Sequence, residues 1–124
     1  MVQVMVLIMA AVFILGACGA SYKQISQDEA MKIMEEETGY LIVDVRRPDE
    51  FAEGHIEGAI NVPNEEIADE MPEKLPDKDQ LLLVYCRTGR RSKEASAKLA
   101  KIGYTNIHEI GGINTWPGTI ATGD

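Results

Sequence analysis

Apolar residues along this chain recur with two periods, one typical of strands and one typical of helices. Short apolar or β-branched runs, bounded by glycine, proline or charged residues, predict strands. These runs are residues 22–25, 41–45, 59–62, 80–85 and 105–110. Between them, apolar residues recur three and four positions apart, which predicts helical segments. The helical segments are residues 26–39, 48–54, 65–71 and 92–102.

Strands that alternate with helices predict an α/β fold, with a mainly parallel central sheet flanked by helices. The run at 80–85 is the most apolar, so we expect it near the centre of the sheet. In such sheets the functional site lies beyond the carboxyl ends of the strands. The residue that follows this run is Cys86, so the pattern directs attention to the loop that Cys86 begins.

Residues 1–20 differ in composition from the rest, because they contain no charged side chain and are nearly all apolar. Such a segment is typical of a signal peptide or a membrane anchor. It contains Leu15-Gly16-Ala17-Cys18, which resembles a bacterial lipobox and implies cleavage before Cys18 and lipidation of its sulfur. We expect residues 1–21 to be a signal and lipid tether, or an uncleaved anchor, and residues 22–124 to form one domain. Both readings predict a domain in the bacterial cell envelope, tethered to the membrane and facing the periplasm or the exterior.

The chain is acidic, with a formal net charge of -8. This balance argues against binding to nucleic acid, which requires a basic surface. Three of the five arginines nevertheless lie within the six residues from Cys86 to Arg91. If Cys18 carries a lipid, Cys86 is the free thiol of the mature protein and a candidate reactive group. We expect no metal site, because no second cysteine or nearby histidine completes a zinc ligand set.

The segment after Cys86 has the composition of an anion site. The thiolate is the reactive form of cysteine, and nearby cations and a helix N-terminus favour it. Gly89 allows the backbone to wrap its amides around the sulfur, while Thr88 and Ser92 offer hydroxyl groups, Ser92 also as a helix cap. Arginine forks match anionic substrates. We therefore expect Cys86 to be catalytic and the following residues to bind substrate: Arg87, Thr88, Gly89, Arg90, Arg91 and Ser92.

Two ordered stretches resemble signatures of the rhodanese family. The first contains Asp44-Val45-Arg46, Glu50-Phe51 and the run from Gly54 to Pro63. The second contains the strand, Cys86 with its loop and the next helix, followed by Gly111-Gly112 and Trp116. The resemblance covers about residues 22–120, which is essentially the whole predicted domain.

The resemblance implies a single-domain rhodanese-like fold and a sulfurtransferase that works in two steps. Cys86 takes sulfane sulfur from an anionic donor such as thiosulfate, and the resulting persulfide passes that sulfur to cyanide or a thiol. We expect no cofactor and a monomer. Asp44 and Arg46, at a strand end, are expected to support the loop by hydrogen bonds and an ion pair. His55 and Trp116 are interpreted as structural.

Three alternatives remain open at this stage. The same fold hosts phosphatases and arsenate reductases, whose usual loop is Cys-x5-Arg. Here Cys86 and Arg91 are separated by four residues, and the next position is Ser92, so the spacing favours sulfur over phosphate. The domain could also be a binding module without turnover, or a redox sensor in which Cys86 is oxidised.

Overall fold

The computed structural model describes residues 21–123. Its strands are β1 (Lys23–Gln24), β2 (Leu41–Asp44), β3 (His55–Ile56), β4 (Ile60–Asn61), β5 (Leu82–Cys86), β6 (Ile107–Gly112) and β7 (Ile120–Ala121). Its helices are α2 (Gln27–Glu36), α3 (Pro48–Glu53) and α4 (Arg90–Ile102), with the 3-10 helices η1 (Asn64–Glu66) and η2 (Ile113–Thr115). None of the helices in this range combines the length and apolar character that crossing a bilayer requires.

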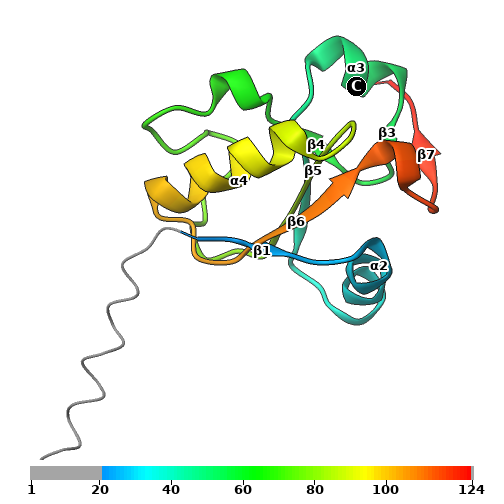
Figure 1. The fold of residues 1–124 in the computed structure, drawn as a ribbon, viewed down its shortest axis with the longest axis horizontal. Helices are drawn as coiled ribbons and strands as arrows, with labels where there is room; N and C mark the ends of the chain where they lie inside the picture. The colour runs from blue at the N-terminus through cyan, green and yellow to red at the C-terminus, as the bar shows by residue number, and fades with distance from the viewer. Residues whose placement is uncertain (1–20, 124) are drawn as a thin grey trace, which may run out of the picture.

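Five strands form one parallel sheet in the order β1-β6-β5-β2-β4. Strand β5 is central, and all of its residues are buried between β2 and β6. Strands β3 and β7 pair antiparallel in a separate two-stranded sheet. Figure 1 shows α4 and α2 on opposite sides of the main sheet. The predicted α/β fold, with a mainly parallel sheet flanked by helices, is confirmed.

Successive side chains of β5 pack into two different cores. Leu82 and Val84 belong to the core that α4 covers. Leu83 and Tyr85 belong to the core that α2 covers. Because side chains alternate along a strand, Cys86 lies on the α4 side, and it is part of that first core. The nucleophile predicted from the sequence is therefore directed under the start of α4.

The two long helices begin with different caps. Helix α2 has the predicted capping box, in which the Ser26 hydroxyl accepts the Glu29 amide at 3.0 Å and Glu29 accepts the Ser26 amide at 3.2 Å. Helix α4 begins at Arg90, so the predicted start near Ser92, with Ser92 as the cap, is wrong. Gly89 is the capping residue, and its left-handed backbone (φ 114°) turns the chain into the helix two residues earlier.

Three other elements differ from the prediction. The expected helix at 65–71 is the short helix η1, because the backbone becomes extended at Ile67. Strands β3 and β7 were not predicted, since they lie outside the apolar runs and pair with each other across a long stretch of sequence. The predicted signal or anchor, with Cys18, lies outside the described residues and stays a prediction.

Candidate active site

Cys86 is the last residue of β5, and three residues connect it to α4. Its sulfur accepts the backbone N–H of Gly89 at 3.0 Å and lies 3.4 Å from the Ser92 hydroxyl oxygen. The residue is 1% exposed, so its sulfur is almost completely covered. The sulfur thus has apolar core on one side and polar partners on the other.

Two glycines allow the loop to take this shape. Gly89 has φ 114°, a left-handed conformation that favours glycine. Gly112, the partner of Cys86 across the sheet, lies against the loop backbone. A β-carbon at position 112 would lie 2.0 Å from the carbonyl oxygen of Arg87, so only glycine fits there. This steric clash explains why the second residue of the Gly111-Gly112 pair is glycine.

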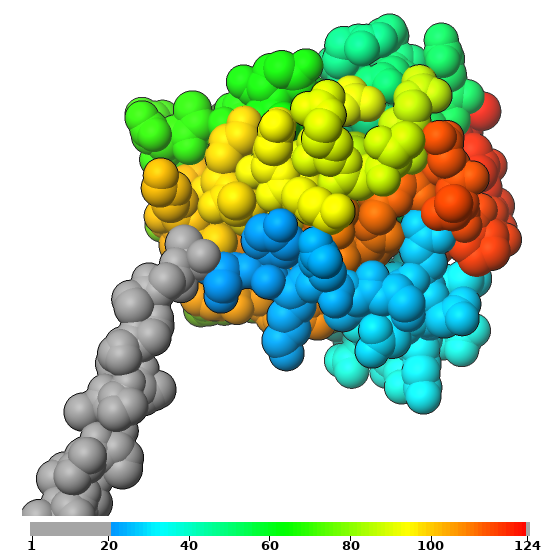
Figure 2. Space-filling model, in the orientation of Figure 1, coloured from blue at the N-terminus to red at the C-terminus, as the bar shows by residue number. Residues whose placement is uncertain are grey.

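The loop arginines contact acidic side chains. Arg87 Nη2 lies 3.1 Å from Glu50 Oε2, and Arg91 Nη1 lies 2.8 Å from Glu50 Oε1. Arg90 lies 3.5 Å from Glu94 on the exposed face of α4. In Figure 2 the yellow-green atoms of the loop and of the start of α4 lie between the green-cyan atoms of α3 and the orange-red atoms that follow β6. Two of the predicted substrate-binding arginines thus meet on one carboxylate, and the third lies on the exposed face of α4.

Glu50 is one of two acidic residues at this site whose roles were not predicted from the sequence. Its hydrogen bond with Arg91, together with those from the Arg47 amide and Arg87, lowers its pKa from 4.5 to about 2 although burial acts in the opposite direction. The same contact raises the pKa of Arg91, and negative charge at Cys86 adds to that effect. The sequence pattern of a helix cap could have identified Glu50. Pro48 is the first residue of α3 and Glu50 the third, and the cap holds the Glu50 carboxylate at the helix start.

Asp44 and Arg46 form a buried ion pair, with Arg46 Nη2 2.7 Å from Asp44 Oδ2. The Tyr85 hydroxyl donates to the same Asp44 oxygen at 2.6 Å and accepts the Ile56 amide at 3.0 Å. Arg46 also donates to the carbonyl of Gly54 at 2.6 Å. The pair therefore holds Tyr85, the residue before Cys86, and the 54–56 segment; it does not touch the loop itself.

The remaining predicted groups have distinct positions. Thr88 is exposed in the loop, and Ser92 is fully buried under it. The Ser92 hydroxyl donates to the carboxylate of Glu109, a residue of β6 that was not predicted to be functional. His55 is stacked on Phe51, with ring centroids 3.8 Å apart, and its Nδ1 contacts the Phe51 carbonyl at 2.8 Å, which fits a structural role.

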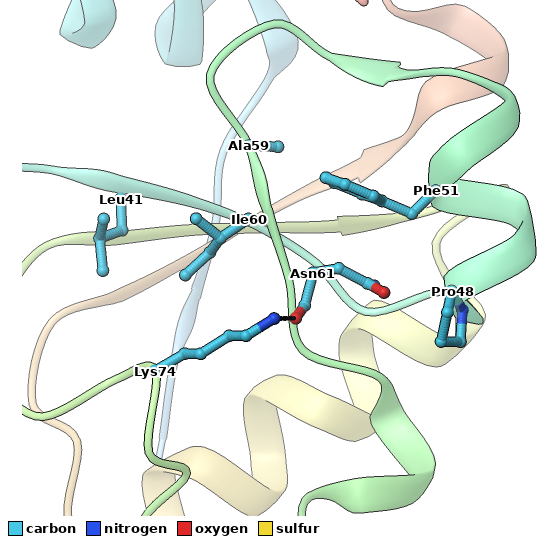
Figure 3. Close-up of a pocket in the computed structure, with 7 residues that line it drawn as sticks. All are labelled: Leu41, Pro48, Phe51, Ala59, Ile60, Asn61 and Lys74. Atoms are coloured by element: carbon cyan, nitrogen blue, oxygen red, sulfur yellow. Dashed lines mark hydrogen bonds between the residues drawn. The ribbon is translucent and has the colours of Figure 1, made fainter. Parts of the chain in front are cut away.

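A groove of about 720 Å³ lies on another part of the surface (Figure 3). Its lining residues are Leu41, Pro48, Phe51, Ala59, Ile60, Asn61 and Lys74. The Lys74 ammonium donates to the Asn61 carbonyl at 2.9 Å at the edge of β4. None of the lining residues belongs to the Cys86 loop, although Pro48 and Phe51 are on α3, the helix that carries Glu50.

Comparison with known proteins gives this arrangement a family. Residues 26–118 match the model of the Rhodanese-like domain. The chain is 36% identical over 110 residues to "Thiosulfate sulfurtransferase GlpE" of Pseudomonas entomophila (strain L48), covering 85% of this chain and 97% of that protein. It is 39% identical over 127 residues to "Uncharacterized protein YqhL" of Bacillus subtilis (strain 168), covering 97% of each.

A solved structure described as "rhodanese with anions from E. coli" superposes with a TM-score of 0.62. It is 33% identical in sequence, and the match covers 68% of this chain and 99% of that one. The chain therefore belongs to the rhodanese-like domain family. Within that family it is a single-domain member, since one matched region includes all strands of the main sheet except β1.

Proposed function

We propose that this protein is a sulfurtransferase that carries sulfane sulfur on Cys86. The observation that supports this most directly is the contact of 3.0 Å between the Cys86 sulfur and the Gly89 amide, at the N-terminus of α4. An amide that points at sulfur stabilises negative charge on it. The sulfurtransferase named among the similar proteins supports the choice of sulfur as the transferred atom.

The first half-reaction is a displacement at sulfur. The Cys86 thiolate attacks the outer sulfur of thiosulfate, a new S–S bond forms, and the bond to the departing sulfite breaks with its electron pair on sulfite. In the second half-reaction, cyanide or a thiolate attacks the outer sulfur of the persulfide. The Cys86 thiolate leaves with the electron pair of the S–S bond, so no external oxidant or reductant is consumed.

The loop arginines are proposed to attract the anionic donor. Arg87 and Arg90 have side chains that are 52% and 75% exposed, so they can meet a donor at the surface. Arg91 is 20% exposed and is held closer to the loop by Glu50. We propose that the donor meets the more exposed guanidinium groups of Arg87 and Arg90 first and the more buried one of Arg91 next, before it reaches the sulfur.

Mass spectrometry of the protein after incubation with thiosulfate tests this function. We expect Cys86 to gain the mass of one sulfur atom, and cyanide to remove it with release of thiocyanate. The Cys86→Ser variant should keep its circular dichroism spectrum and gain no sulfur. An intact wild-type protein that gains no sulfur, or a serine variant that still does, contradicts the proposal. An aryl phosphate, tested in parallel, should not be hydrolysed.

We also propose, on the sequence pattern alone, that the domain is a monomer tethered to the membrane through lipid on Cys18. Expression of the full chain in a bacterium with a radiolabelled fatty acid should label the protein, and Cys18→Ser should abolish the label. An unlabelled protein that is still in the membrane fraction would favour the uncleaved anchor instead.

A further inference from the structure

Three buried side chains form a continuous chain beneath the loop, from Cys86 through Ser92 to Glu109. Their residues are 1%, 0% and 3% exposed, respectively. The Cys86 sulfur lies 3.4 Å from Ser92 Oγ, in the geometry of an S–H donor and an oxygen acceptor. Ser92 Oγ in turn donates to Glu109 Oε2, which also accepts the Gly111 amide at 3.0 Å. A carboxylate on β6 is therefore linked to the nucleophile by one hydroxyl group.

The number of hydrogens on Ser92 restricts what this chain can do. A serine hydroxyl donates one hydrogen bond and accepts up to two. While Glu109 is ionised, the hydrogen of Ser92 goes to the carboxylate, because a charged acceptor is stronger than the Gly89 carbonyl at 3.0 Å. Ser92 then has only lone pairs to offer Cys86, and lone pairs stabilise the thiol rather than the thiolate.

The charges around Glu109 do not offset its own. On β5 the facing titratable group is Cys86, and on α4 it is the Ser92 hydroxyl. On β1 the residue in register is Gln24, and on α2 Gln27 donates to the neighbouring carbonyls of β6, so both are neutral.

Lys23 of β1 is in register with His108, one residue away along β6. Lys23 and Glu29 of α2 act electrostatically on that histidine. Within residues 21–123 no Lys, Arg or His forms an ion pair with Glu109. Two negative charges in this small buried space, one at Cys86 and one at Glu109, strongly disfavour each other.

We infer that Glu109 is a positioning residue that controls the ionisation of Cys86 through Ser92, and that Cys86 and Glu109 share one ionisable proton, which the Ser92 hydroxyl relays. When the thiolate forms, the S–H proton passes to Ser92 Oγ while the Ser92 hydrogen passes to Glu109 Oε2. The thiolate then accepts the hydroxyl of Ser92 and the amide of Gly89, and Glu109 is neutral. Protons and charge balance, and no group is left without a partner. An ionised Glu109 holds Cys86 as a thiol.

This role rests on the proposed sulfur transfer for its purpose, but it can be tested without sulfur. The rate at which iodoacetamide alkylates Cys86 reports the thiolate and can be followed against pH. Removal of the charge by Glu109→Gln should raise this rate about tenfold near pH 6 and move the midpoint of the profile to lower pH, since a unit of midpoint is a factor of ten. The control variant Glu36→Gln removes an exposed acid of α2 and should leave the profile unchanged.

The sign of the shift separates this inference from a structural role. A purely structural Glu109 predicts no shift, or a slower reaction from a disturbed loop, and either result overturns the inference. In the Ser92→Ala background the effect of Glu109→Gln should become clearly smaller, because the route through the hydroxyl is gone. An equally large effect in that background would show that the charge acts directly through space and would overturn the role of Ser92.

Wild-type protein provides a second measurement if Glu109→Gln does not fold. Temperature-difference infrared spectroscopy at fixed pH should show a protonated carboxyl band that rises and falls together with the thiolate absorbance, because the transfer releases no proton to solvent, and Cys86→Ser should lack this band. Ionisation of Cys86 with no new carboxyl band contradicts proton sharing. A protein that shows the shift and the band but gains no sulfur from thiosulfate keeps this inference and loses the proposed function.

Discussion

Two carboxylates flank the Cys86 loop at nearly equal burial, yet their surroundings differ. Glu50 is 5% exposed and is held by the guanidinium groups of Arg87 and Arg91. Glu109 is 3% exposed and is held by the hydroxyl of Ser92 and one backbone amide. Burial alone therefore does not decide whether a carboxylate stays charged; its partners do. The guanidinium groups of Arg87 and Arg91, with that of Arg47 at 3.8 Å, fix the charge of Glu50, whereas a hydroxyl lets the proton of Glu109 move.

The two carboxylates also act on different parts of the chemistry. Glu50 holds the cations that a donor anion encounters, so it is suited to govern donor affinity and loop stability. Glu109 touches the sulfur through Ser92, so it is suited to govern the reactivity of the nucleophile. Donor binding is thus governed from the α3 side of the loop, and the ionisation of Cys86 is governed from the β6 side.

Gly112→Ala should have the largest effect, because it disturbs both sides at once. The new β-carbon would meet the Arg87 carbonyl oxygen at 2.0 Å and the Thr88 α-carbon at 2.7 Å, and backbone atoms cannot rotate away. We expect a loss of roughly 3 kcal/mol or more in the free energy of unfolding, and no sulfur gain at Cys86. Urea denaturation and mass spectrometry measure the two effects.

Gly39→Ala is the matched control for this change. Gly39 also has a positive φ, 79°, but nothing lies within 4 Å of its missing β-carbon. The cost should be about 1 kcal/mol from backbone conformation alone, with sulfur loading intact. Equal losses at the two positions would show that the close approach of β6 to the loop is unimportant.

Glu50→Gln removes the charge on the α3 side alone. It should lower the free energy of unfolding by roughly 2–3 kcal/mol, since a buried carboxylate with charge-assisted hydrogen bonds is lost. The freed Arg87 and Arg91 should attract a donor anion more strongly and lower the thiosulfate KM about fivefold. Denaturation and steady-state kinetics check this pair of effects. A higher KM would mean that Glu50 positions the arginines for the donor and does not compete with it.

The parts of the molecule that the sequence predicted well are those that carry a local pattern. The strands at 41–45 and 80–85 were recognisable because helices cover both faces of the sheet, which makes these runs continuously apolar. The Cys86 loop was recognisable because its arginines are consecutive or nearly so. By contrast, β3 and β7 pair His55 with Ala121, residues far apart in sequence, and no local period reveals such a pairing.

The two carboxylates escaped prediction for a related reason. Glu50 and Glu109 reach the loop from α3 and β6, and a sequence without coordinates does not say which acid meets which base. Glu109 did leave a trace, an acidic residue inside a predicted strand and two residues before Gly111. A charged residue in an apolar strand of a central sheet requires a partner, and that signal could have identified it.

Acid should destabilise the protein because it protonates Glu50 of α3. The pKa of Glu50 is about 2 in the folded protein and 4.5 ordinarily, so its contribution is complete above about pH 4.5. That stability is lost as the pH falls toward 2, because protonation breaks the contacts with both arginines. Thermal unfolding between pH 2 and 6 should show this loss in the wild type. The Glu50→Gln variant should show a flatter profile, and an equally steep one would assign the acid sensitivity to other groups.

Arg90→Ala should have the smallest effect on stability. It tests the one loop arginine that contacts neither Glu50 nor Glu109 in the described residues. Its side chain is 75% exposed and lies 3.5 Å from Glu94, so its removal should change the free energy of unfolding by less than about 0.5 kcal/mol. Arg91→Ala should cost more, since it removes the shortest ion pair of the buried Glu50, 2.8 Å, and leaves that carboxylate with Arg87 at 3.1 Å and Arg47 at 3.8 Å.

The effect of Arg90→Ala on the thiosulfate KM should be large compared with its effect on stability. Arg90 is not tied to Glu50 and can turn toward an anion without breaking a buried contact, so Arg90→Ala should raise the thiosulfate KM at unchanged stability. Urea denaturation and steady-state kinetics on the two variants separate these effects. If the KM of the Arg90→Ala variant equals that of the wild type, the arginines that contact Glu50 attract the donor. Donor binding then depends on Glu50 and its arginines, and the ionisation of Cys86 depends on Glu109.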